Sequence, residues 1–143
     1  MTTIKTDLSK LVELEKKARM PFSESCTFLE MKDLGEKHMF LVMMAGGFAE
    51  TCAGLKVTVS FVSEPGIPFL AAYNKTGKKE GLIIFNLAKL DDEFWDKKAR
   101  QLEVIVHELG HHWGGHLDHT YHEAICRIAG NAAAASNIDW GAV

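Results

Sequence analysis

The sequence predicts an α+β domain in which a small, mostly antiparallel sheet packs against a buried helix and further helices. Residues 56–63 alternate β-branched or aromatic residues with polar ones, as in a half-buried strand. Residues 70–86 contain two apolar arms around a polar, lysine-rich tip, a pattern typical of a β-hairpin. Residues 92–113 include a stretch that is apolar almost all round, which indicates a central helix.

Length and composition limit the possible classes of protein. A chain of 143 residues fits one domain, which we expect to span 1–143. The net charge of −3 provides no basic surface for nucleic acid, and the longest apolar run, 39–49, is shorter than the roughly 20 residues of a membrane span. Three widely spaced cysteines and no apolar signal-peptide core favour a reducing, cytoplasmic location.

The first part of the chain is expected to be largely helical. Residues 7–19 have an amphipathic pattern that Pro21 ends. Residues 22–44 fit either two strands around a turn at 33–35 or a helix from about residue 33, and the helix is favoured. It would continue to residue 55, with methionines 31, 39, 43 and 44 filling the core.

The middle of the chain is expected to form the sheet. The strand 56–63 ends at the turn-forming residues 64–66, and the hairpin arms are 70–74 and 80–86. The second arm is apolar at every position from 82 to 85. It is therefore buried on both faces or covered by a ligand.

Two further helical regions complete the chain. Asp91 and Asp92 are good N-caps for one long helix, or for two helices that meet near Lys98, ending at about residue 113. The glycine pair 114–115 would end this region. A last helix is expected over 120–135, with Ile125, Ile128, Ala129 and Ala132 facing inward.

Six of the seven histidines lie between residues 107 and 122, in a stretch that opens with His107-Glu108-Leu109-Gly110-His111. Positions i and i+4 of a helix share a face and lie about 6 Å apart, so both imidazoles can bind one metal ion. Glu108 projects beside that position. Zinc lowers the pKa of a bound water to roughly 7, and a neighbouring carboxylate can accept the proton as a general base. His-Glu-x-x-His is therefore the zinc-binding pattern of metallopeptidases.

A catalytic zinc site needs a third protein ligand so that the fourth position stays open for water. His116 is the favoured residue because the glycine pair allows the chain to reverse just before it. The alternatives, which lie further along the chain, are Asp118, His119, His122 and Glu123. His112 points about 100° away from the metal-binding face, so we expect it to have a surface or packing role. His38 has no predicted function.

The segment 104–116 resembles the zincin superfamily of metallopeptidases, and the order of elements from about residue 45 onward resembles a minimal, single-domain zincin. The resemblance implies that the motif helix packs beneath a small sheet whose edge strand, here 80–86, binds a peptide by strand addition. Some zincin families place a third histidine ten residues after the first. That position is Leu117 here, and a loop shorter by one residue would bring His116 there instead. Other minimal zincins take an acidic ligand from the next helix, which would be Glu123.

The sequence thus predicts a zinc metallopeptidase that hydrolyses a peptide bond, with Glu108 as its general base and a peptide or protein as its substrate. His119, Tyr121 and His122 are candidates for stabilising the oxyanion or orienting a ligand. The alternative is a catalytically inactive binding module with the same fold, in which the zinc is structural. Recognition of DNA is not expected, because the chain has no basic stripe.

Overall fold

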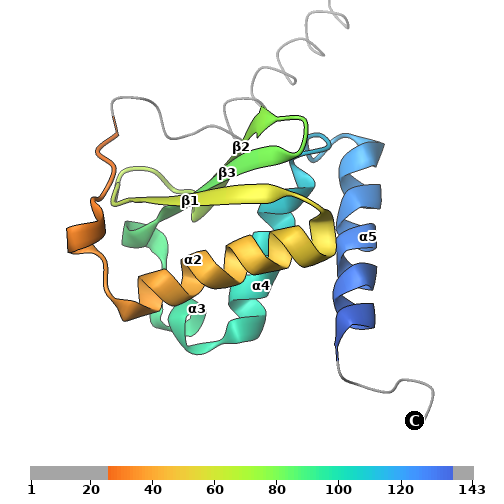
Figure 1. The fold of residues 1–143 in the computed structure, drawn as a ribbon. Coiled ribbons are helices and arrows are strands. Elements are labelled where there is room, and N and C mark those ends of the chain that lie inside the picture. Colours follow the sequence, from red (N-terminus) through yellow and green to blue (C-terminus); the bar gives the residue numbers. More distant parts are fainter. Residues whose placement is uncertain (1–25, 137–143) are drawn as a thin grey trace, which may run out of the picture.

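The computed structural model describes residues 26–136 and confirms the predicted α+β class. The helix predicted for residues 7–19 lies outside this range. The main elements follow the chain as α2 (Glu36–Phe48), β1 (Lys56–Val62), β2 (Ala71–Gly77), β3 (Glu80–Asn86), α3 (Asp92–Asp96), α4 (Lys98–Gly110) and α5 (His119–Ala135) (Figure 1). Among the described residues, no helix is both long and apolar enough to cross a bilayer.

Helix α2 occupies the region for which two strands were the alternative, so the helical interpretation is correct. Its first turn is capped by His38, whose Nδ1 accepts a hydrogen bond from the Gly35 N–H at 2.8 Å. Beyond α2, a π-helical turn (Ala49–Ala53) ends at Gly54, whose φ of 66° suits a residue without a Cβ. Upstream of α2, Phe28 forms a β-bridge with Val62, and the Leu29 N–H donates to the Phe61 carbonyl at 2.9 Å.

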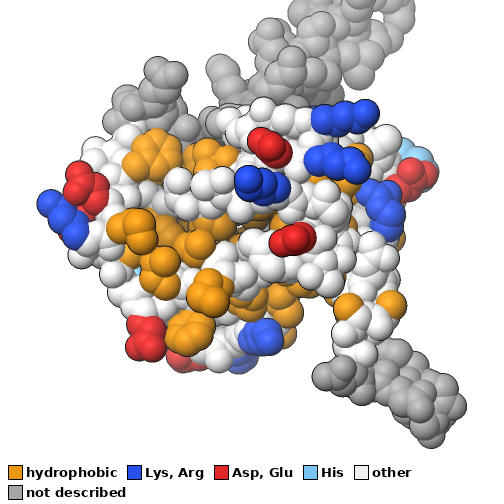
Figure 2. Space-filling model, viewed as in Figure 1, with side chains coloured by type: hydrophobic (Ala, Val, Ile, Leu, Met, Phe, Trp, Pro, Cys, Tyr) orange, Lys and Arg blue, Asp and Glu red, His pale blue; other side chains and the backbone are white. Residues whose placement is uncertain are grey.

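The outer face of α2 carries large apolar side chains that remain exposed. Phe40 is 63% exposed and Met43 is 70% exposed. Hydrophobic side chains are visible over this part of the surface (Figure 2). Met31 is also exposed, at 73%, so the prediction that the four methionines fill the core is wrong for Met31 and Met43.

The sheet is mixed, and not mostly antiparallel as predicted. Its strand order is β1-β3-β2, with β1 parallel and β2 antiparallel to β3. Strand 80–86 therefore lies in the centre and is not the edge strand that the zincin resemblance implied. The reason is its apolar sequence: Ile83 and Phe85 face the main core, while Ile84 packs on the other face beside Val62. A strand that is apolar on both sides is most stable with a neighbour on each edge.

The two-helix alternative for residues 92–113 is confirmed, because α3 and α4 meet at Lys97. Asp91 is the predicted N-cap, and its Oδ1 accepts a hydrogen bond from the Phe94 N–H at 2.9 Å. Helix α4 buries Ile105 and Leu109 completely in the core. These contacts fix the helix that carries the His-Glu-x-x-His motif.

Helix α4 ends at Gly110, before the predicted glycine pair. The N–H groups of residues 111, 112 and 113 bond to carbonyls three residues earlier, so the helix tightens into a turn. Gly110 is required where α5 crosses, because an added Cβ would lie 2.6 Å from Ile125 and 2.7 Å from the Tyr121 ring. Ile128 is buried in α5 as predicted, but Ala129 is exposed.

Candidate metal centre

Three imidazoles meet at the end of α4. His107 belongs to its last turn, His111 is its C-cap residue and His116 lies in the loop before α5. Each contributes one ring nitrogen to a group in which these atoms lie within 4.8 Å of one another. The Nε2 atoms of His107 and His116 are 3.0 Å apart. Two ring nitrogens at that distance need a proton or a cation between them, and tetrahedral zinc holds two nitrogens about 3.3 Å apart. The three side chains could therefore hold a metal ion.

The loop between α4 and α5 brings His116 back over the helix end. Gly114 has a φ of 154°, and a Cβ there would lie 2.7 Å from the Asp118 Oδ2. That same oxygen accepts a hydrogen bond from the Gly115 N–H at 2.8 Å, and the Thr120 hydroxyl donates to the Trp113 carbonyl at 2.6 Å. The two glycines and these side-chain bonds close a tight reversal, which carries His116 to the other two histidines.

Tyr121 determines which nitrogen of His107 is available. The tyrosine hydroxyl donates to the His107 carbonyl oxygen at 3.3 Å and lies 3.2 Å from His107 Nδ1. When the hydroxyl donates to the carbonyl, its oxygen can accept a hydrogen bond from the Nδ1–H of His107. In this tautomer the lone pair is on Nε2, the atom that faces His116. Burial lowers the pKa of His107, with a further contribution from His116, so the ring is neutral at neutral pH, as a metal ligand must be.

His111 is oriented in the same way by a backbone carbonyl. Its Nδ1 donates to the Gly114 oxygen at 3.0 Å, which places the lone pair on Nε2. The Tyr121 ring stacks on the imidazole, with ring centroids 4.8 Å apart at 30°. Tyr121 is itself only 3% exposed. One buried tyrosine thus contacts two of the three histidines. The carbonyl partner of His111 is of a type that commonly orients histidine ligands around bound metals.

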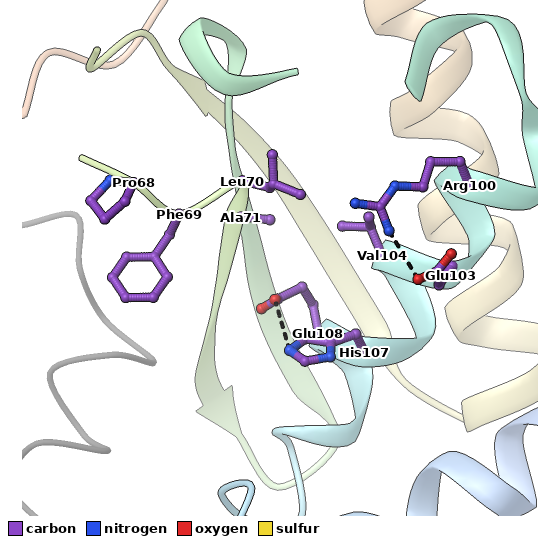
Figure 3. A pocket seen from close by; sticks show the side chains of 9 residues that line it. All are labelled: Pro68, Phe69, Leu70, Ala71, Arg100, Glu103, Val104, His107 and Glu108. Atoms are coloured by element: carbon purple, nitrogen blue, oxygen red, sulfur yellow. Dashed lines mark hydrogen bonds and ion pairs between the residues drawn. The ribbon is translucent and has the colours of Figure 1, made fainter. Parts of the chain in front are cut away.

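Glu108 lies beside His107 and is almost fully buried. Its Oε1 is 3.9 Å from His107 Nε2 (Figure 3). Burial raises the pKa of the Glu108 carboxyl to about 8. A positive charge placed among the imidazoles would favour the ionised form and lower this value.

A cavity of about 340 Å³ opens next to Glu108 and His107. It lies between α4 and the segment that leads into β2, and Figure 3 shows the two walls facing each other. Apart from Glu108 and His107, its lining consists of Pro68, Phe69, Leu70, Ala71, Arg100, Glu103 and Val104. The wall formed by residues 68–71 was not predicted, because its approach to α4 depends on the position of β2 beside β3.

His112 lies next to His111 in the chain but takes no part in this group. It is 4% exposed, its Nδ1 is 2.5 Å from the Tyr73 hydroxyl, and its Nε2 is 2.7 Å from the Lys78 carbonyl oxygen. Both ring nitrogens therefore make contacts that hold the turn after α4 against the β2–β3 hairpin. Its role is packing, the second of the two roles expected for it, and Tyr73 was not anticipated as its partner.

The alternative third ligands make other contacts. His122 Nε2 donates to the His116 carbonyl at 2.9 Å, which supports the loop from outside. His119 and Glu123 form an exposed pair at 2.9 Å, and Asp118 holds the reversal at Gly115. Within residues 26–136, the group able to hold a metal comprises His107, His111 and His116.

Comparisons with protein-family models, with curated proteins and with solved structures found no match to this chain. The site must therefore be interpreted from its own geometry.

Proposed function

We propose that the protein is a zinc-dependent metallopeptidase of the zincin type, in which His107, His111 and His116 hold the zinc. The observation that carries this proposal is the convergence of three imidazoles beside a buried carboxylate that lines a cavity. Three neutral nitrogen ligands would form the donor set of a catalytic zinc site, which leaves room for a bound water. When bound, the zinc ion supplies a Lewis acid that makes water more acidic and polarises a carbonyl oxygen.

In this proposal Glu108 moves the protons of the reaction. Its carboxylate accepts a proton from the water whose oxygen forms a bond to the carbonyl carbon of the substrate. The carbon–nitrogen bond then breaks, and Glu108 returns the proton to the departing amine. Its position 3.9 Å from His107 Nε2 places the carboxylate next to the ligand group, and its burial excludes competing solvent. Tyr121 orients His107, since its hydroxyl already bonds to that residue.

The substrate polypeptide would enter through the cavity beside Glu108. The segment 68–71 forms the wall opposite α4 and continues into β2, which pairs with β3 along one side. An extended peptide beside this segment would place a carbonyl group near Glu108. This assigns to β2 the role that the zincin resemblance implied for strand 80–86.

The deciding experiment compares Glu108→Gln with the wild type, both loaded with zinc. We expect elemental analysis to find equal zinc content in the two proteins. The rate at which the variant hydrolyses a degenerate peptide library should be more than about 100-fold lower, because glutamine cannot accept the proton. Glu103→Gln is the matched control, since Glu103 lines the same cavity but its side chain is 69% exposed. Full hydrolysis by Glu108→Gln would refute the mechanism. Tightly bound zinc without any hydrolysis by the wild type would instead indicate a binding module with a structural zinc.

A further inference from the structure

The side chains of His107 and Glu103 stand between two cavities. The first is the cavity beside Glu108 described above. The second has a volume of about 450 Å³ and lies between α4 and α5. Both cavities are lined by His107 and Glu103, so the candidate metal centre adjoins each of them.

The second cavity is apolar apart from these two shared residues and the Tyr121 hydroxyl. Helix α4 contributes Leu102 and Val106, the facing side of α5 contributes Tyr121, Ile125 and Ala129, and Phe48 of α2 also lines the cavity. Leu102, Val106 and Ile125 are all half-buried, although aliphatic side chains between two packed helices are usually covered. The space exists because the far part of the α5 wall is alanine, at positions 129 and 132. The two helices thus touch at Gly110 and leave an open groove further along, which we call the channel.

One end of this channel lies at the His107 ring of the candidate metal centre, and the channel leads away from it. At one end Tyr121 bonds to His107, and at the other Ala132 and Phe48 line the wall. Eleven helical positions separate Tyr121 from Ala132, which corresponds to about 16 Å along α5. An extended polypeptide of about five residues has this length. A chain whose reacting carbonyl lies at the imidazoles can therefore continue directly into the channel.

We infer that this channel receives an apolar stretch of the substrate polypeptide on one side of the hydrolysed bond, an inference that rests on the proposed hydrolase function. The lining contains no lysine or arginine, and its single carboxylate, Glu103, is already paired with Arg100 at 2.9 Å. A charged segment would find no partner there, whereas the burial of aliphatic side chains against this apolar lining would be favourable. The substrate class is thus polypeptide with consecutive large apolar residues next to the cleavage site.

The first test is a cleavage profile. The zinc-loaded wild type is incubated with a degenerate decapeptide library, and the cleaved bonds are located by mass spectrometry. We expect enrichment of leucine, isoleucine, valine, phenylalanine and methionine at two or more consecutive positions on one side of the bond. Cleavage without such enrichment overturns the inference and leaves the hydrolase proposal standing.

A variant that fills the channel provides the structural test. Ala129→Trp places an indole in the channel, and we expect kcat/KM for a selected apolar peptide to fall by about 10-fold or more. Ala133→Trp is the matched control, because Ala133 is exposed on α5 like Ala129 but does not line the channel. Both variants should retain zinc and the wild-type melting temperature within a few degrees. Equal losses in both variants, or no loss in Ala129→Trp, would overturn the assignment.

Binding without turnover separates this inference from the proposed function. A fluorescent leucine-rich decapeptide should bind zinc-loaded Glu108→Gln about 10-fold more tightly than its serine counterpart, and Ala129→Trp should remove the difference. If the wild type hydrolyses no peptide but this preference persists, the hydrolase proposal fails and the apolar channel stands. Equal affinities overturn the channel. Displacement of the peptide by dodecanoate at lower concentrations than by unlabelled peptide would assign the channel to acyl chains and overturn the choice of polypeptide.

Discussion

His111 and His112 are neighbours in the sequence and both are buried, yet their rings make contacts on different sides of the same turn. His111 uses Nδ1 to bond to the Gly114 carbonyl and joins the group that could hold a metal. His112 uses both ring nitrogens within the protein, at the Tyr73 hydroxyl and the Lys78 carbonyl. We call the side of the turn that carries His111 the metal side, and the side that carries His112 the hairpin side.

A histidine is a candidate ligand where a partner holds its Nδ1 and its Nε2 faces other imidazoles. On the metal side, one carbonyl or one hydroxyl fixes the tautomer and directs Nε2 to the other imidazoles. On the hairpin side, two partners satisfy the ring completely, so a metal would have to break a buried hydrogen bond. The metal side should therefore control metal affinity, and the hairpin side should control stability.

The largest expected effect is the loss of metal on removing His111. His111→Ala should lower the affinity for zinc by more than about 100-fold, beyond what changes outside the ligand set usually cause. His112→Ala should lower it by less than about 3-fold, because its ring does not face the group, while the melting temperature falls. Competition with a zinc chelator measures both affinities, and calorimetry measures the melting temperatures. A similar loss of affinity in both variants would remove the distinction between the two sides.

In the metal-free protein, Glu108 and His112 should contribute pH dependences of stability that have opposite signs. The pKa of Glu108 is raised to about 8 by burial, so the folded state binds more protons than the unfolded state above the ordinary value of 4.5. Stability should therefore fall by a few kcal/mol as the pH rises from about 4.5 to 8. Burial lowers the pKa of His112, chiefly by desolvation, so protonation favours unfolding and stability should fall as the pH drops below 6.5.

Urea unfolding across this pH range tests both signs. Glu108→Gln should remove most of the loss at high pH, because glutamine does not ionise. His112→Gln should reduce the loss at low pH, and the remainder should come from His107, whose pKa is lowered in the same direction. A Glu108→Gln variant that still loses stability between pH 4.5 and 8 would contradict the assignment of the alkaline effect to Glu108.

The sequence predicts the features of the two sides that depend on local structure, and it does not predict those that depend on tertiary packing. Helical spacing alone places His107 and His111 on one face and turns His112 away. The glycine pair indicates where the chain can reverse towards His116. Tyr121 meets His107 only because α5 crosses α4 at Gly110, and that contact depends on tertiary packing.

The order of the strands in the sheet also could not be predicted from local sequence patterns. The apolar run 82–85 indicates a strand buried on both faces, but its place between β1 and β2 follows from pairing with residues far along the chain. The position of His112 against Tyr73 depends on this order, because Tyr73 lies on β2. Periodicity predicts which residues face inward and says little about which strand lies at an edge.

A moderate effect is expected from the tyrosine on the metal side. Tyr121→Phe retains the ring that stacks on His111 and removes only the hydroxyl that fixes His107. The affinity for zinc should fall by about 10-fold, the lower end of the range for losing an orienting partner. Chelator competition measures this loss, and Tyr121→Ala should lose more because the stacking also disappears. Unchanged affinity in Tyr121→Phe would mean that the helix alone orients His107.

The smallest effect is expected from the tyrosine on the hairpin side. Tyr73→Phe removes the hydroxyl that meets His112 Nδ1 and leaves that nitrogen without its partner in a buried site. The free energy of unfolding should fall by about 1–2 kcal/mol, measured by urea titration, and the affinity for zinc should change by less than about 2-fold. Gly81 lies directly against the Tyr73 ring, so phenylalanine still fills the space and the loss reflects the hydrogen bond. If Tyr73→Phe lowered zinc affinity as much as Tyr121→Phe, the hairpin would be part of the metal centre, and the two sides of the turn would act as one unit.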